Sequence, residues 1–212
     1  MHDIIGMYEG GLNILKLLFK AIDNSDIEKV KQIISEDPTL VSCVADMPQE
    51  IEGQSPLQVS IIKSECEIAN YLIDQGADVN SIGAGSLDEW KIPVLHVAIK
   101  AAIKNSRFPR RAADGPKNDG TLFNKHLEIL KRLLDEGADI NQVDSYGNLP
   151  IMRAVLDALN LDLSITDDEL DEDIRSVFHL LQDYGADIQE RTDNRKSVEE
   201  MFRNNVVIDY FK

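Results

Sequence analysis

The sequence predicts an all-α solenoid, an array of about five stacked helix-turn-helix units. Two strings recur in alternation along its 212 residues. The first opens a helix each time and begins at Ser55, Pro93 and Leu149. The second, Gly-Ala-Asp, follows a stretch with helical apolar spacing and begins at Gly76, Gly137 and Gly185. A single helix-turn-helix unit cannot bury its apolar face alone, so the units must stack on one another.

The array is expected to begin and end with atypical units. Terminal repeats differ from central ones because one of their faces meets water. In chain order we expect an N-terminal capping repeat, three central repeats and a C-terminal cap, over residues 12–52, 53–91, 92–147, 148–194 and 195–212. These units form a single domain over residues 1–212.

The first string carries a family resemblance. Its copies read Ser-Pro-Leu-Gln-Val-Ser, Pro-Val-Leu-His-Val-Ala and Leu-Pro-Ile-Met-Arg-Ala. With the Gly-Ala-Asp strings, they resemble the ankyrin-repeat family, whose unit of about 33 residues is a turn plus two helices marked by T-P-L-H-x-A. The resemblance implies that His96, at the patterned histidine, makes a structural hydrogen bond to the backbone of a finger. We use "finger" for the loop that joins successive units.

Local signals predict where the helices start and stop. Ser25 with Glu28, and Ser64 with Glu67, have the spacing of capping boxes and predict the starts of two second helices. The glycine of each Gly-Ala-Asp string predicts a left-handed C-terminal cap. In the first unit Pro38 ends the helix instead, because proline cannot continue one.

Two insertions of opposite charge separate the paired helices of repeats three and four. The basic insertion covers about residues 104–124, within a stretch whose net charge is +5, and the acidic insertion covers about 161–173 with a net charge of −7. We expect them to lie side by side and to pair electrostatically; the alternative for each is a mobile loop. The acidic residues after Thr166 also fit the first turn of a helix, which favours negative charge.

Composition limits the classes of function. The net charge of −16 disfavours binding to nucleic acid or anionic membranes and favours a basic partner. Cys43 and Cys66 are too few for a disulfide framework, which favours a reducing compartment. No apolar run approaches the roughly 20 residues of a membrane span. We therefore expect a soluble, cytoplasmic protein that is monomeric when free.

Common catalytic motifs are absent from the sequence. It contains no G-x-S-x-G, no P-loop and no H-E-x-x-H. The histidines fall in different units, at His2, His96, His126 and His179. We expect no enzyme activity, no cofactor and no metal site. The alternative, an enzyme hidden in the two insertions, predicts a deep polar pocket between them.

The resemblance implies that partners dock on the fingers and on the exposed side of each first helix. Trp, Tyr and Arg are the commonest binding hot spots, and acidic neighbours steer a cationic partner. The candidate partner-binding residues are Glu50, Glu52, Asp88, Glu89, Trp90, Asp144, Tyr146, Met152 and Arg153. An alternative binding edge comprises Arg107, Phe108, Arg110 and Arg111. Trp90 is the first choice of anchor, although it could instead pack on the next finger, and Asp144 could simply make its finger's turn.

The predicted function is a non-catalytic protein–protein interaction module that binds a basic protein. One concrete form is an inhibitor or immunity protein that covers the active site of a cationic enzyme or toxin. The alternative is an adaptor or scaffold that uses the charged insertions as a second binding surface.

Overall fold

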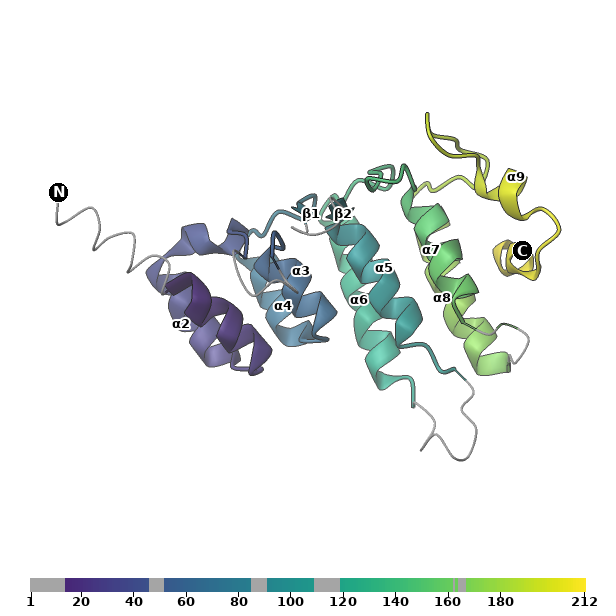
Figure 1. Ribbon diagram of the computed structural model, residues 1–212. Coiled ribbons are helices and arrows are strands. Elements are labelled where there is room, and N and C mark those ends of the chain that lie inside the picture. Colours follow the sequence, from purple (N-terminus) through teal and green to yellow (C-terminus); the bar gives the residue numbers. More distant parts are fainter. Residues whose placement is uncertain (1–13, 46–51, 85–90, 109–118, 162, 164–166) are drawn as a thin grey trace. The chain divides into compact units, whose positions relative to one another are not determined.

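The computed structural model describes residues 14–45, 52–84, 91–108, 119–161, 163 and 167–212. They belong to two compact units, unit 1 over residues 1–94 and unit 2 over residues 95–212, and each is described by itself. Figure 1 shows that paired helices make up most of both units. The mostly helical fold predicted from the sequence is confirmed.

Unit 1 combines helical pairs with one hairpin. Its elements are a helix over 14–23, α2 (Ile27–Glu36), a 3₁₀ helix (Pro38–Ser42), α3 (Pro56–Ile62), α4 (Cys66–Asp74), β1 (Ile82–Ala84) and β2 (Lys91–Pro93). The helix α2 buries Val30, Ile33 and Ile34, which follow helical spacing and so lie on one face. It ends at Glu36, two residues before Pro38, as predicted.

The two strands are an addition to the predicted all-α fold. β1 pairs antiparallel with β2, with Ile82 opposite Pro93. Gln58 of α3 fastens this hairpin, because its Nε2 donates to the carbonyl of Ile92 at 2.8 Å. The same side chain accepts from the backbone N–H of Ser55 at 3.0 Å and so closes a capping box at the start of α3. Gln58 thus caps α3 and also bonds to the β1–β2 hairpin of the second finger.

The capping boxes predicted at Ser25 and Ser64 are wrong. Both serines have positive φ, at 58° and 63°, and stand one residue before the actual N-cap. In α2 the cap is Asp26, whose carboxylate accepts from the backbone N–H of Lys29 at 3.0 Å. Ser25 instead donates from Oγ to Glu65 at 2.6 Å, so it links two neighbouring turns.

Unit 2 contains two long helical pairs and a C-terminal segment. Its elements are α5 (Val94–Lys104), whose first residue belongs to unit 1, α6 (Thr121–Asp135), α7 (Pro150–Leu159), α8 (Asp168–Asp183), α9 (Val198–Phe202) and a 3₁₀ helix (Val206–Phe211). Asp168 to Asp173, expected within the acidic insertion, form the first turns of α8. Asp167 caps this helix by accepting from the backbone N–H of Leu170 at 3.0 Å.

The glycine caps follow the prediction. Gly76, Gly137 and Gly185 follow the C-cap residues of α4, α6 and α8 and have φ values of +82°, +90° and +96°. Residues with a Cβ rarely adopt this conformation, which explains why glycine recurs there. At the C-terminus, Phe211 stacks on Phe178 of α8 with ring centroids 4.5 Å apart, so the last segment covers that helix.

Candidate functional site

The third finger, residues 141–148, is shaped by a buried aspartate. The Asp144 carboxylate accepts from the backbone N–H groups of Tyr146 and Asn148 at 2.9 and 3.0 Å, and from the Asn148 side-chain amide at 2.9 Å. Gly147 completes the turn with φ +76°. The turn displays the Tyr146 ring, and the residue is 53% exposed. These contacts agree with the alternative interpretation of Asp144 given above, in which it forms the turn of its finger.

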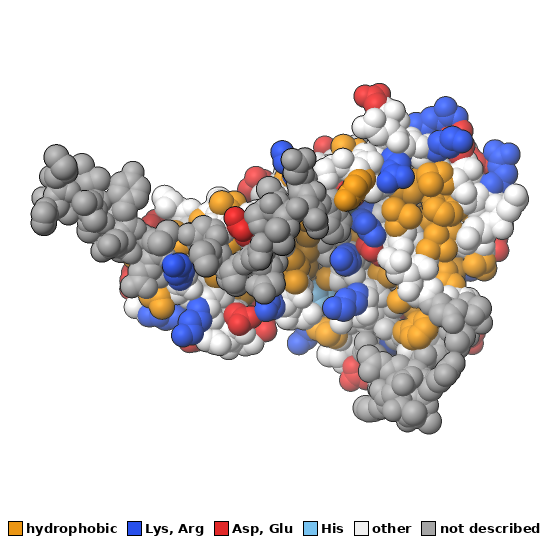
Figure 2. Space-filling model, in the orientation of Figure 1, with side chains coloured by type: hydrophobic (Ala, Val, Ile, Leu, Met, Phe, Trp, Pro, Cys, Tyr) orange, Lys and Arg blue, Asp and Glu red, His pale blue; other side chains and the backbone are white. Residues whose placement is uncertain are grey.

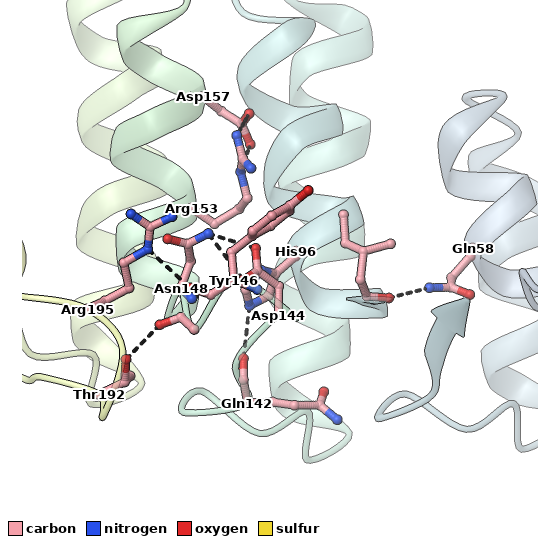
Figure 3. Close-up of polar contacts among 12 residues, drawn as sticks. Gln58, His96, Gln142, Asp144, Tyr146, Asn148, Arg153, Asp157, Thr192 and Arg195 are labelled. Carbon is pink, nitrogen blue, oxygen red and sulfur yellow. Dashed lines mark hydrogen bonds and ion pairs between the residues drawn. The ribbon is translucent and has the colours of Figure 1, made fainter. Parts of the chain in front are cut away.

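His96 ties α5 to the same finger. Its Nε2 lies 2.9 Å from the carbonyl oxygen of Gln142, which can only accept, so Nε2 carries the proton. The ring is fully buried, and burial lowers the pKa of His96 to about 4. The neutral ring faces Asp144 through Nδ1, at 4.0 Å from the carboxylate. The predicted hydrogen bond from His96 to the finger backbone is confirmed (Figure 3).

The fourth finger, residues 189–197, is fastened to the third. The Thr192 hydroxyl donates to the carbonyl of Gly147 at 2.8 Å, and Arg195 Nε donates to the carbonyl of Tyr146 at 3.1 Å (Figure 3). A Cβ on Gly147 would come within 3.1 Å of Asn194 and 3.2 Å of Thr192, so glycine also permits this close approach. The two fingers thus form one preorganised surface.

A hollow lies between these two fingers at the start of α7; we call it the interfinger hollow. Buried apolar side chains, Leu149, Met152 and Val198 among them, form its floor. Glu190, Arg195 and Lys196 of the fourth finger stand on its rim. The hollow therefore combines an apolar floor with a rim that has one more cation than anion.

α7 carries an ion pair next to the hollow. Arg153 Nε donates to Asp157 at 2.9 Å, one helical turn away, and both side chains are largely buried (Figure 3). Burial raises the pKa of Asp157, while Arg153 and Lys100 of α5 act in the opposite direction. Asp157 thus pairs with Arg153 and lies within the electrostatic influence of Lys100.

Charge is unevenly distributed among the helices of unit 2. The first helices hold three basic residues against one acidic residue, because α5 has two lysines and no acid while α7 has one arginine and one aspartate. The second helices, α6 and α8, hold four basic against eight acidic residues. Figure 2 shows Lys and Arg side chains over α5 and α7, beside apolar side chains at the start of α7. The first-helix face of unit 2 is therefore cationic in an acidic chain.

Arg107 joins the predicted basic and acidic segments. Its guanidinium donates to Asp173 through Nε at 3.0 Å and Nη2 at 2.6 Å, and its backbone N–H donates to the same carboxylate at 2.7 Å. Glu172 and Glu169 pair with it at 3.0 and 3.5 Å. The hydrogen bonds with Asp173 are the main reason why the pKa of Arg107 is raised. The predicted pairing of the two segments occurs through this arginine.

The structure describes only some of the candidate binding residues. Glu50, Asp88, Glu89 and Trp90, and likewise Arg110 and Arg111, lie outside the described residues. Glu52 and Phe108 are half-buried, and Met152 is buried on the floor of the interfinger hollow. Of the candidates brought together in unit 2, Tyr146 is the most exposed. Their roles in binding remain predictions.

Sequence reasoning missed three residues of the fourth finger. Thr192 and Arg195 bond to the third finger, and Lys196 stands with Arg195 on the rim of the hollow. The repeat register could have found them, because residues 192–197 precede α9 as residues 144–149 precede α7.

The described residues contain neither a metal-binding cluster nor a membrane-spanning helix. No group of three or more His, Cys, Asp or Glu side chains among them is placed to hold a metal ion. Within the same part of the chain, no helix combines the length and apolar character needed to cross a membrane.

Comparisons with known proteins point to one family. Residues 121–145 match the family model "Ankyrin repeat". An ankyrin repeat protein of Rickettsia bellii is 36% identical over 158 residues, which cover 71% of this chain and 21% of that protein. An ankyrin repeat protein of fowlpox virus is 29% identical, covering 50% of this chain and 16% of its own length. Zinc finger CCCH domain-containing protein 29 of Arabidopsis thaliana is 27% identical, covering 68% and 21%.

The chain thus spans about a fifth of the length of these relatives. The family match contains α6, the Gly137 cap and the first part of the third finger. These are among the features on which the sequence resemblance depends. The chain therefore belongs to the ankyrin-repeat family.

Proposed function

We propose that this chain is a non-catalytic module that binds a protein partner through its fingers and the exposed sides of its first helices. Ankyrin repeats generally mediate protein–protein interaction. The observation that carries the proposal is the pair of joined fingers in unit 2, which displays Tyr146 next to the interfinger hollow. An exposed aromatic residue on a preorganised surface is a typical binding hot spot.

The first two fingers belong to the same proposal. Their sequences supply acidic residues around one tryptophan, Trp90, and this composition favours a basic partner. A protein that covers a cationic enzyme or toxin, as an inhibitor or immunity protein does, would use such fingers.

The charge of unit 2 favours a second candidate function, that of an adaptor. Its first-helix face is cationic, whereas the first two fingers are acidic in sequence. Surfaces of opposite charge suit different partners, because like charges facing one another across an interface are unfavourable. An adaptor would hold one partner at each surface.

Site-specific photocrosslinking tests both functions. A photoreactive phenylalanine analogue replaces Tyr146 in one variant, Trp90 in a second and the exposed Lys125 of α6 in a control. We expect specific protein adducts from positions 146 and 90 and none from 125. The same adduct at both positions supports one partner, and different adducts support the adaptor. Adducts equally abundant at all three positions would contradict the proposed surface.

A further inference from the structure

We infer that the interfinger hollow and the lysine-bearing side of α5 bind an acidic segment of a protein partner. One apolar side chain of this segment rests over the hollow, and flanking carboxylates pair with the cations of the rim. The inference rests on the proposed protein-binding function and adds the chemistry of the partner. It differs from the basic partner suggested by the net charge of −16.

The hollow is a shallow, apolar contact surface. Its floor includes Leu149, Met152 and Val198, which are each less than a tenth exposed. Because these residues expose so little area, covering them contributes little at about 25 cal/mol per Å², and the cations of the rim supply most of the attraction for a partner. The Thr192–Gly147 and Arg195–Tyr146 hydrogen bonds fix both walls before a partner arrives, so binding does not need to order them.

The cations at the hollow remain available to a partner. Arg195 uses Nε to hold the Tyr146 carbonyl, and a guanidinium has further N–H donors that can bind a carboxylate. Lys196 is exposed and forms no ion pair with any described residue. Glu190 is the single acid of the rim, and the neighbouring Arg191 is neutralised by Glu200. The rim therefore keeps a net positive charge.

The cationic character continues along the first helices. Met152 of the hollow adjoins Arg153, which pairs with Asp157, and Lys100 of α5 acts electrostatically on the same carboxylate. Lys104 lies four residues beyond Lys100 and hence on the same side of the helix. An extended acidic segment seated in the hollow would thus meet further cations, whereas a basic segment would meet like charges.

The net charge of the chain does not oppose this binding. Screening limits the reach of exposed charges to about 8 Å at physiological ionic strength. An incoming segment therefore responds mainly to charges close to it, and these are the cations of α5 and of the rim. Among the paired helices of unit 2, most acidic residues are on α8, a second helix.

Peptide binding tests the inference. The probes are three fluorescein-labelled synthetic peptide pools with the same central Leu, Phe or Trp, flanked by Asp/Glu, by Lys/Arg or by Ser/Gln. Fluorescence anisotropy with the full chain measures their affinity at low and high salt. The test variant combines Lys196→Glu with Lys104→Glu. The control reverses two exposed charges on the second helix α6, Lys125→Glu and Lys131→Glu, and so changes the net charge equally.

We expect the acidic pool to bind best, more weakly at high salt, and to lose about tenfold in affinity with the test variant but not with the control. Preference for the basic or neutral pool, or equal losses in both variants, would overturn the inference and leave the binding function standing. Preference for a single-stranded oligonucleotide over the acidic pool would overturn it too. If no pool binds, the inference fails, and the photocrosslinking experiment still decides the proposed function.

Discussion

Replacing Asp173 by asparagine should destabilise unit 2 by about 2–3 kcal/mol. Asp173 is 1% exposed and accepts hydrogen bonds from both the backbone and the guanidinium of Arg107. Removing one partner of a fully buried ion pair costs about 3–5 kcal/mol, since the other charge is left uncompensated. The Arg107 side chain is 21% exposed and can partly rehydrate, so the expected loss is smaller. Glu172→Gln is the matched control, because Glu172 pairs with the same guanidinium but its side chain is 70% exposed.

Urea unfolding followed by circular dichroism measures both variants. The control should lose less than about 1 kcal/mol, and its effect should disappear at high salt, whereas the Asp173 effect should persist. A repeat array need not unfold in one step, so hydrogen exchange of the α8 amides provides a second measurement of the same contact. Equal destabilisation by the two substitutions would show that burial does not set the strength of this pair, and the reasoning would be refuted.

Two further predictions concern buried histidines and helix caps. Burial lowers the pKa of both His96 and His126 to about 4, against 6.5 for an ordinary histidine. The unfolded chain therefore binds more protons below pH 6.5, and the free energy of unfolding should fall by about 2 kcal/mol per histidine between about pH 7 and about pH 5. Urea titrations across that range measure the fall, and a flat profile would contradict the pKa assignment. Ser55→Ala should cost about 1 kcal/mol by removing a cap from α3, whereas Ser25→Ala, outside the cap of α2, should cost clearly less in thermal unfolding; the reverse order would contradict the cap assignment.

Features set by nearby residues or by the repeat pattern could be predicted from the sequence. The glycine cap after each second helix depends on local conformation alone, because a residue with a Cβ rarely adopts the left-handed conformation required there. The hydrogen bond of His96 spans 46 residues, yet it was predicted because the family pattern relates that histidine to its finger. The repeat pattern thus supplied long-range information that periodicity alone does not contain.

The two misplaced capping boxes show that a shift of one residue is enough to make the prediction of a helix start wrong. Ser25 and Ser64 have the required spacing to a glutamate, but each helix starts one residue later. The tight turn between paired helices puts both serines at positive φ, a conformation that the N-cap residue does not adopt. The actual boxes, at Ser55 and Ser197, precede helices that begin after a finger.

Contacts between segments distant in the sequence were predicted only in outline. Opposite charges in the two segments indicated attraction, but they did not identify Arg107 and Asp173, which are 66 residues apart. Their selection depends on burial, since Asp173 belongs to the inward-facing set of α8. The joined third and fourth fingers were missed for a similar reason: hydrogen bonds to backbone carbonyls leave no mark in the sequence of the accepting residue.

Net charge was a weak guide to the partner of unit 2 because helix pairing separates charges. In a stacked helical pair, the second helix and the first helix expose different sides, and nothing requires these sides to carry the same charge. In unit 2 the helix with the most acidic residues is α8, whose first turns favour negative charge through the helix dipole and whose Asp173 holds Arg107. Much of this acidity therefore serves the fold. The charge that a docking segment meets is that of α5, α7 and the fourth finger, and it is positive.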